Sequence, residues 1–327
     1  MSERLVAVSY PADDETEARS RKIIGDRAHV VFIGKMNEEE RRGALSVAEV
    51  LMSWQFSREL SADDLARAKR LGFVQLLNAG VDASDLAAVP QNVAVASNVG
   101  AYSEPMAEHV MAMTLALAKR LPERHAQMAR GDWDQRHFSL SLDGALCAIV
   151  GYGGIGKATA RLMRCFGARI WALNKTGRTQ DDVEFTGTLA DLDHVLREAD
   201  VVVLSIPLTT STRALIGARE LEQMKPKAIL INVARGAIVD ERALYDHLRS
   251  HPEFRAGIDT WWHEPLRQGE FRTDFPFFEL PNLIGSPHNS AIVSGINDRG
   301  TRQAMENVMR FLRDETIIGV VRREDYI

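Results

Sequence analysis

The chain has 327 residues, a formal net charge of −5 and 45% hydrophobic residues. This length is sufficient for two ordinary domains, and the apolar content is sufficient for two cores. The negative charge argues against nucleic acid or an anionic membrane as the main partner, because proteins that bind them usually carry a basic surface.

The cysteines and the N-terminal residues indicate the cellular compartment of the protein. Only two cysteines occur, Cys147 in a predicted core strand and Cys165 in a predicted core helix. This is the profile of a reduced protein rather than of a disulfide framework. No apolar run approaches the ~20 residues of a membrane span, and the charged first residues lack a signal-peptide core. We therefore expect a soluble cytoplasmic protein without a membrane partner.

Short apolar runs alternate with charged segments over the first hundred residues. This alternation predicts strands followed by helices, and therefore a parallel sheet with helices on both faces. The predicted strands are 5–10, 29–34, 49–54, 73–78 and 93–97, and the predicted helices include 14–25 and 61–72. A long helix with little polar surface follows at 103–121, and we expect it to be buried between domains or subunits.

A second alternation begins near residue 144. Its predicted strands are 145–150, 169–173, 200–206, 228–233, 254–259 and 282–286, and its predicted helices are 155–166, 189–198, 217–224, 240–250 and about 290–313. The two alternations predict an α/β protein of two doubly wound parallel-sheet domains with a cleft between them. In such sheets ligands bind beyond the carboxyl ends of the strands.

A glycine-rich turn, "AIVGYGGIGKATA", directly follows a predicted strand and opens a helix. Gly151 permits the tight turn, Gly153 lets backbone N–H groups approach a pyrophosphate, and Gly156 lets the helix pack closely on the strand. Because strand, turn, helix and next strand have the right order and length, the turn predicts a dinucleotide site rather than a plain connection.

The loop after the next strand indicates which dinucleotide. A site built for NAD usually offers Asp or Glu there to the adenosine ribose, but this chain has Asn174, followed by Lys175, Thr176 and Arg178. A carboxylate would repel a 2′-phosphate, whereas Asn does not and the basic side chains can pair with one. The loop therefore favours NADP over NAD, and a merely solvated basic loop is the alternative.

Three loops after later strands carry unusual polar residues, namely Arg235, then Asp259 with Glu264, and finally His288. A guanidinium binds a carboxylate through two parallel hydrogen bonds, and a histidine passes a proton to a carbonyl oxygen. A glutamate bonded to that histidine favours its protonated form. The set predicts reduction of a 2-oxoacid, with His263 as the one serious alternative to His288.

With these motifs in place, the sequence resembles the D-isomer-specific 2-hydroxyacid dehydrogenases, which include glyoxylate and hydroxypyruvate reductases, formate dehydrogenase and phosphite dehydrogenase. The resemblance covers nearly the whole chain, in family order and spacing. It rests on "GYGGIG", "IPLTTSTRALIG", "MKPKAILINVARGAIVDERAL", "AGIDTWWHEP" and "LPNLIGSPHNS".

The resemblance implies roles for individual residues. Arg235 matches the substrate-binding arginine, Glu264 and His288 match the acid/base pair, and Asp259 matches the contact to the nicotinamide carboxamide. Further implied cofactor contacts are Met106, Gly154, Ile155, Pro207, Thr212 and Ala234. For the substrate it implies backbone contacts at Ala79 and Gly80, with Trp54 and Tyr102 as pocket walls or, equally, ordinary packing residues.

The resemblance also implies a discontinuous, flavodoxin-like substrate domain of residues 1–99 and 295–327, with a Rossmann cofactor domain of residues 100–294 inserted. We expect NAD(P)H-dependent reduction of a small 2-oxoacid such as glyoxylate or hydroxypyruvate, in a homodimer, and no metal site. Because Glu264 stands where formate dehydrogenase has glutamine, that activity is disfavoured. A phosphite-type dehydrogenase and a dinucleotide-sensing, corepressor-like binding protein remain alternatives.

Overall fold

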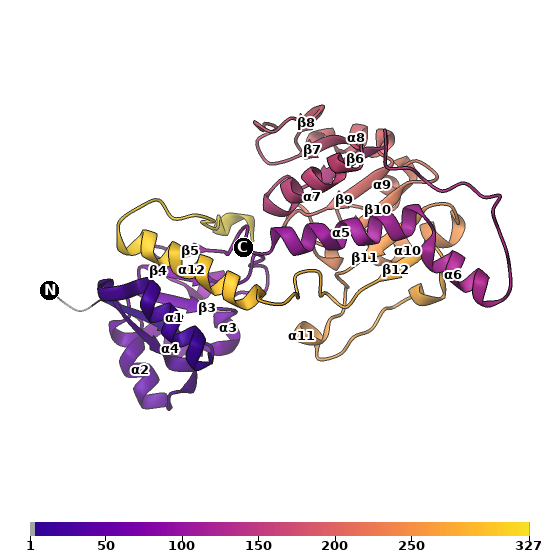
Figure 1. Cartoon of the computed structure of the whole chain (residues 1–327). Helices are drawn as coiled ribbons and strands as arrows, with labels where there is room; N and C mark the ends of the chain where they lie inside the picture. The colour runs from indigo at the N-terminus through magenta and orange to yellow at the C-terminus, as the bar shows by residue number, and fades with distance from the viewer. Residues whose placement is uncertain (1–3, 327) are drawn as a thin grey trace. The chain divides into compact units, whose positions relative to one another are not determined.

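The computed structural model describes residues 4–326, without the side chain of Arg267. It divides into two compact units, Met1–Tyr102 with Val293–Ile327, and Ser103–Ile292 (Figure 1). Each unit is built on a parallel sheet covered by helices, which confirms the predicted fold class. No helix among the described residues is long and apolar enough to cross a membrane.

The first unit contains a five-stranded sheet in the order β2-β1-β3-β4-β5, with every neighbouring pair parallel. All five strands lie where the apolar runs predict them. Their bounds are β1 Leu5–Val8, β2 His29–Phe32, β3 Val50–Ser53, β4 Phe73–Leu76 and β5 Ala94–Ala96. The chain reverses its direction of winding between β1 and β3, which is the point where such sheets open toward a ligand.

Helices cover both faces of this sheet. Side chains of α1 (Asp14–Ile24) and α12 (Ile296–Leu312) pack on one face. Side chains of α2 (Glu38–Val47), α3 (Phe56–Glu59) and α4 (Ala62–Arg67) pack on the other. Successive residues of β1 point to opposite faces, as strand geometry requires: Val6 and Val8 join the first core, and Ala7 joins the second.

The second unit contains a seven-stranded parallel sheet in the order β12-β11-β10-β9-β6-β7-β8. The three-residue strand β8 is not among the predicted strands. The bounds are β6 Leu146–Val150, β7 Arg169–Leu173, β8 Phe185–Gly187, β9 Val201–Leu204, β10 Ile229–Asn232, β11 Arg255–Ile258 and β12 Leu283–Gly285. The winding reverses between β6 and β9, so the crevice for a dinucleotide is expected at the carboxyl ends of these two strands.

Helices again form two layers. Side chains of α5 (Ser103–Ala118) and α7 (Gly154–Cys165) pack on one face of the sheet. Side chains of α8 (Leu192–Glu198), α9 (Ala218–Gln223) and α10 (Glu241–Ser250) pack on the other. Five apolar side chains of α5 belong to the core of its own unit, namely Val110, Met111, Met113, Leu117 and Ala118. Two further helices are α6 (Leu121–Ala129) and α11 (Pro265–Gln268).

Three predicted helices begin or end at other residues than the sequence indicated. The helix predicted over 103–121 is interrupted because Arg120 adopts a left-handed conformation, with φ 56°, between α5 and α6. The helix predicted from about 290 begins only at Ile296, after Gly295 at φ 75°. The helix predicted over 61–72 ends at Arg67. Cys165, expected in the core, is exposed.

Candidate active site

The glycine turn between β6 and α7 has the backbone shape expected of a phosphate-binding turn. Gly151 has φ +102°, and a Cβ on it would lie 2.5 Å from the backbone nitrogen of Ile206. A Cβ on Gly156 would lie 2.4 Å from the carbonyl oxygen of Gly151. Both positions therefore require glycine, the first because of its conformation and its contact with the chain after β9, the second because α7 approaches the turn closely.

Gly153 differs from these two, because a Cβ on it would meet no atom within 4 Å. It is the N-cap residue of α7, and no side chain caps the N–H groups of Gly154 and Ile155 that begin the helix. Open space beside uncapped helix N–H groups suits an anion, which the positive end of the helix dipole also favours. The residues present therefore fit the pyrophosphate of a dinucleotide.

The loop after β7 is shaped by the side chain of Asn174. Its amide nitrogen donates to the carbonyl oxygen of Arg178 at 2.8 Å, and its oxygen accepts from the backbone N–H of Thr176 at 2.9 Å. Gly177 turns the loop with φ +63°. Lys175, Thr176 and Arg178 are exposed. The predicted specificity loop is thus a small, internally bonded turn with two basic side chains on its surface.

Four other predicted cofactor contacts have varied surroundings. Met106 is half-buried in the first turns of α5, and Pro207 is exposed after β9. The hydroxyl of Thr212 is buried and donates to the carbonyl oxygen of Pro207 at 2.7 Å, so it shapes the loop itself. Ala234 is buried, and its N–H donates to the side chain of Asn232 at 3.0 Å.

Arg235 lies just beyond β10, in a loop that Asn232 holds at its base. The Asn232 side chain also donates to the carbonyl oxygen of Arg235 at 2.9 Å, which fixes the backbone beneath the guanidinium. Next along the chain, a Cβ on Gly236 would lie 2.3 Å from the carbonyl carbon of Trp261. The glycine therefore allows the loop of Arg235 to contact the backbone that follows β11.

Glu264 and His288 form a direct pair. The Nδ1 atom of His288 lies 2.9 and 3.0 Å from the two carboxylate oxygens of Glu264. The carboxylate is positioned by the N–H of Trp261, which donates to it at 2.9 Å, and it is nearly buried. Since an ionised carboxylate can only accept, Nδ1 carries the proton and Nε2 remains the nitrogen for exchange with a ligand.

The rival histidine has different neighbours. The Nε2 atom of His263 lies 3.5 Å from the guanidinium of Arg272 and 3.9 Å from a carboxylate oxygen of Asp274. No hydrogen bond joins its ring to Glu264 among the described contacts. The geometry therefore supports His288, rather than His263, as the histidine that works with Glu264.

Asp259 is fully buried at the end of β11 and organises the loop that carries His288. Its carboxylate accepts from the Ser286 hydroxyl at 2.5 Å and from the N–H groups of Asn289 and Ser290 at 3.1 and 3.2 Å. Its backbone oxygen accepts the N–H of His288 at 2.8 Å. These bonds stabilise His288 in a left-handed conformation, with φ 50°, that non-glycine residues seldom adopt.

His109, on α5, lies next to Asp259 and was not identified from the sequence. The Nε2 atom of His109 lies 2.9 Å from the Ser286 hydroxyl and 3.7 Å from the Asp259 carboxylate. Burial disfavours the charged form of Asp259, but the hydrogen bonds from Ser286, Ser290 and Asn289 and the nearby His109 lower its pKa below the ordinary value. The only signal in the sequence was a histidine on an apolar helix, which has no specific meaning alone.

The predicted substrate contacts of the first unit follow the carboxyl ends of β3, β4 and β5. Trp54 is half-buried and packs edge-on against Tyr10, and Ala79 and Gly80 are half-buried in the loop after β4. Tyr102 is buried, and its hydroxyl donates to the carbonyl oxygen of Leu77 at 2.6 Å. Burial raises the pKa of Tyr102 to about 12, against a lowering hydrogen bond with Asn98. These contacts favour ordinary packing over substrate contact for Tyr102.

Glu59, another residue that the sequence did not single out, ties together the ends of β1 and β3. Its carboxylate accepts from the hydroxyls of Ser9 and Ser53 at 2.5 and 2.7 Å, and from the N–H of Gln55 at 2.8 Å. It therefore holds the backbone on both sides of Trp54 at the point where the sheet reverses its winding.

Comparisons with known proteins support the resemblance. Residues 111–290 match the family model described as "D-isomer specific 2-hydroxyacid dehydrogenase, NAD binding domain". The chain is 31% identical over 277 residues to a glyoxylate reductase of Thermococcus gammatolerans, covering 82% of this chain and 81% of that protein. It is 29% identical over 304 residues to a D-3-phosphoglycerate dehydrogenase of Methanocaldococcus jannaschii, covering 92% of this chain and 56% of that protein.

The chain thus spans about half the length of the D-3-phosphoglycerate dehydrogenases it matches. Among solved structures it is similar to a D-isomer specific 2-hydroxyacid dehydrogenase of Xanthobacter autotrophicus Py2, in complex with NADPH and MES. That likeness has a TM-score of 0.80 and 26% identity, and it covers 100% of both chains.

The lowered pKa of Asp259 predicts a specific dependence of stability on pH. Such a carboxylate stabilises the fold above its unfolded pKa, and this contribution is lost as the pH falls through the lower folded-state pKa. We expect the urea midpoint of the parent to fall more steeply below about pH 4 than that of Asp259→Asn. Ser286→Ala removes a bond that lowers the folded-state pKa, so its steep region should end at a higher pH and its total loss of stability should be smaller, while the unfolded pKa keeps the upper limit unchanged. Parallel curves for all three proteins would contradict this account.

Proposed function

We propose, since the chain belongs to the D-isomer specific 2-hydroxyacid dehydrogenase family, that it reduces a small 2-oxoacid to a D-2-hydroxyacid with NAD(P)H. The observation that carries this proposal is the His288–Glu264 pair, in which Nδ1 of His288 lies 2.9 and 3.0 Å from the two carboxylate oxygens. The two residues follow the carboxyl ends of the adjacent strands β12 and β11. The pair supplies a proton donor with a defined tautomer, which is what reduction of a carbonyl requires of the protein.

In the proposed reaction His288 acts as general acid. When the imidazole is doubly protonated, its Nε2 proton passes to the carbonyl oxygen of the oxoacid, and Nδ1 stays bonded to Glu264. The carboxylate stabilises the imidazolium before transfer and keeps the ring oriented after it. In the reverse direction Nε2 takes the hydroxyl proton of the hydroxyacid, so one pair serves both directions.

Arg235 is proposed to bind the substrate carboxylate, because a guanidinium fork matches a carboxylate through two parallel hydrogen bonds. The bond from Asn232 to its backbone and the close approach at Gly236 fix the loop from which the side chain extends. Backbone N–H groups of Ala79 and Gly80 are proposed as further donors to that carboxylate. Trp54 is proposed to limit the size of the substrate beside it.

The cofactor is proposed to bind at the glycine turn, with its pyrophosphate at the N-terminus of α7 beside Gly153. When bound, the nicotinamide supplies the hydride that completes the reduction. Lys175 and Arg178 lie exposed on a loop without a carboxylate side chain at position 174, and we propose that they bind the 2′-phosphate of NADPH. NADPH is therefore the proposed preferred reductant.

Glyoxylate and hydroxypyruvate are the proposed substrates. A glyoxylate reductase of similar length supports this proposal, since the chain covers 81% of it. The phosphorylated acid suggested by the D-3-phosphoglycerate dehydrogenases has weaker support, because this chain matches only part of those proteins.

A panel of oxoacids assayed with NADPH and with NADH tests the reaction. His288→Asn should lower kcat by about 10²–10⁴-fold and leave the Kd for NADPH unchanged. Arg235→Ala should lower kcat/KM on the order of 10²–10³-fold, and Arg235→Lys should recover only part of it, since it keeps the charge without the fork. His125→Asn, at an exposed histidine outside the site, is the control.

Unchanged kcat/KM in Arg235→Ala for every oxoacid would remove the proposed role of Arg235. Faster turnover of phosphite than of any oxoacid would favour the phosphite-type alternative. Cofactor binding without turnover of any substrate would favour a dinucleotide-sensing protein.

The cofactor preference has its own test in the loop after β7. Lys175→Ala and Arg178→Ala should each raise KM for NADPH about tenfold, the effect of losing one charge-assisted bond, while KM for NADH changes little. Asn174→Asp should disfavour NADPH further through charge repulsion. Arg169→Ala, at the opposite end of β7 and paired with Glu184, is the control. Equal changes for both cofactors would show that the basic residues only face solvent.

The homodimer is also a proposal, and it rests on apolar side chains on α6 and the segment after it. Met128, Trp133 and Phe138 are 51%, 72% and 97% exposed. Large exposed apolar groups that are close in sequence often mark an interface between subunits. Sedimentation equilibrium should show a dimer that the double variant Trp133→Ser, Phe138→Ser dissociates. The proposal fails if the parent is monomeric, or if Phe278→Ser, at another exposed aromatic, dissociates it equally.

A further inference from the structure

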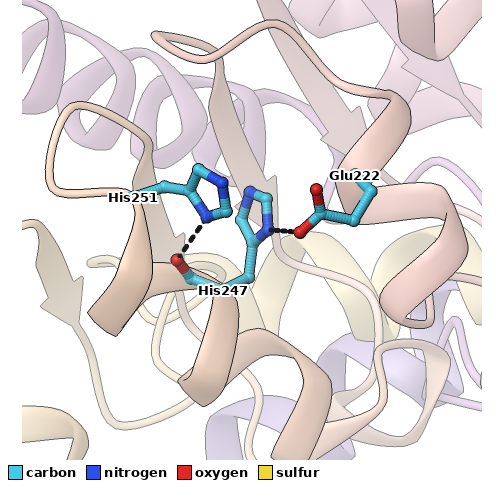
Figure 2. Close-up of side chains that lie close together, drawn as sticks. All are labelled: Glu222, His247 and His251. Carbon is cyan, nitrogen blue, oxygen red and sulfur yellow. Dashed lines mark hydrogen bonds and ion pairs between the residues drawn. The ribbon is translucent and has the colours of Figure 1, made fainter.

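A cluster of two histidines and a glutamate lies between α9 and α10, away from the groups assigned above. His247 and His251 are one helical turn apart at the end of α10, and Glu222 lies near the end of α9 (Figure 2). One donor atom from each of the three residues lies within 4.8 Å of the other two. His247 is buried, His251 is half-buried and Glu222 is exposed.

The position of this cluster separates it from the candidate active site. In a parallel sheet each helix returns the chain from the carboxyl edge to the amino edge, so α9 and α10 end near the amino ends of β10 and β11. His288, Glu264 and Arg235 follow the carboxyl ends of the strands. The cluster is thus at the opposite edge of the same sheet, and the proposed reaction does not use it.

We propose that Glu222, His247 and His251 bind a divalent transition-metal ion of the zinc class, with water as the fourth ligand. Imidazole nitrogen and carboxylate oxygen are donors that zinc takes in proteins, and two histidines one helical turn apart present their rings to the same side. The His247 Nδ1 and a Glu222 oxygen are 3.2 Å apart. Donors ~2.0–2.1 Å from a tetrahedral zinc are separated by about 3.3 Å, so this pair has the spacing that the ion requires. Without the ion Nδ1 donates to the carboxylate, and the ion takes the place of that proton.

The hydrogen bonds of His251 prepare it as a ligand. Its Nδ1 lies 3.1 Å from both the carbonyl oxygen of His247 and the hydroxyl of Ser250. Because the carbonyl can only accept, the bond to His247 places the proton of the neutral ring on Nδ1. Nε2 then holds the lone pair that a metal requires. A histidine ligand whose other nitrogen donates to a backbone carbonyl is the usual arrangement at metal sites.

The backbone beneath the two histidines is fixed by Asn282. Its side-chain nitrogen donates to the carbonyl oxygens of Leu248 at 3.0 Å, His251 at 3.3 Å and Phe254 at 2.8 Å. The end of α10 is therefore held in place.

One movement is needed for coordination. The rings of His247 and His251 are stacked, with centroids 4.1 Å apart and planes 23° from parallel, so their in-plane lone pairs do not converge. His251 is half-buried at the C-cap of α10, so coordination requires its ring to rotate, which gives up the present bond of Nδ1 to the carbonyl oxygen of His247. A surface pocket of ≈ 450 Å³, whose walls include Glu222, His247 and Ser250, gives an ion and its water access.

Three other charged residues line the pocket. Asp240 and Asp246 line it and add negative charge, while Arg242 lines it with its guanidinium 4.8 Å from the ring centre of Phe275. A second group of similar composition, Glu241, His263 and Asp274, serves as a contrast. There the guanidinium of Arg272 lies 3.5 Å from His263 and 3.7 Å from Asp274, so a side-chain cation already lies beside two of the three residues.

The test is calorimetric titration of the chelator-treated full chain with Zn²⁺ at neutral pH. We expect one equivalent to bind, and we expect His251→Gln and Glu222→Gln each to weaken it at least tenfold. His263→Gln, in the contrasting group, should leave binding unchanged, and so should His288→Asn. Circular dichroism verifies that each variant is folded, and Glu222→Gln, on an exposed side chain, avoids the buried position of His247.

Co²⁺ gives a second, spectroscopic readout. Bound tetrahedrally by two nitrogens, a carboxylate oxygen and a water, it should show visible absorption bands that His251→Gln abolishes. The melting temperature of the parent should rise with Zn²⁺ at about 100-fold excess over Kd, and that of His251→Gln should not. The proposal is overturned if no equivalent binds, if His251→Gln and Glu222→Gln bind as the parent does, or if His288→Asn abolishes binding.

Discussion

The bonds of one buried carboxylate determine where the proton-carrying histidine lies. Asp259 directly follows β11 inside the protein, where a charge is tolerated because Ser286, Asn289 and Ser290 donate to it. All three donors belong to the loop after β12, so satisfying the charge also folds that loop over the end of the neighbouring strand. His288 lies within this loop in a conformation it would not adopt alone. The orientation of its ring toward Glu264 follows from that backbone.

Close contact between backbones provides the second constraint on the site. A side chain at Gly236 would collide with Trp261, and one at Gly151 would collide with the chain after β9. At both places the loops that follow two neighbouring strands approach to van der Waals distance. The fixed distance between the strands therefore also fixes the distance between the loops. Polar groups on these loops therefore depend little on side-chain flexibility for their positions, which favours catalysis by preorganised groups.

The sequence was sufficient for every strand except the short β8 and for the position of polar residues after the strands, because both follow from local pattern and from the geometry of parallel sheets. The sequence was insufficient where the role of a side chain depends on a contact that its neighbours in the sequence do not reveal. Nothing near Thr212 shows that its hydroxyl is used within its own loop, and nothing near His109 shows that it supports Asp259. The start of α12 could not be found either, because the N–H groups of Asn289 and Ser290 bond to Asp259, just after β11, instead of beginning a helix.

Asn174 illustrates how a residue can be identified correctly for only part of its role. The sequence indicates a role for Asn174 in cofactor preference because it lacks the negative charge that would repel a 2′-phosphate. In the folded chain its side chain also accepts from Thr176 and donates to the carbonyl oxygen of Arg178. An aspartate could accept the first bond but could not make the second. The amide therefore acts on the neighbouring basic residues through the shape of the turn as well as through charge, and a substitution at this position changes both at once.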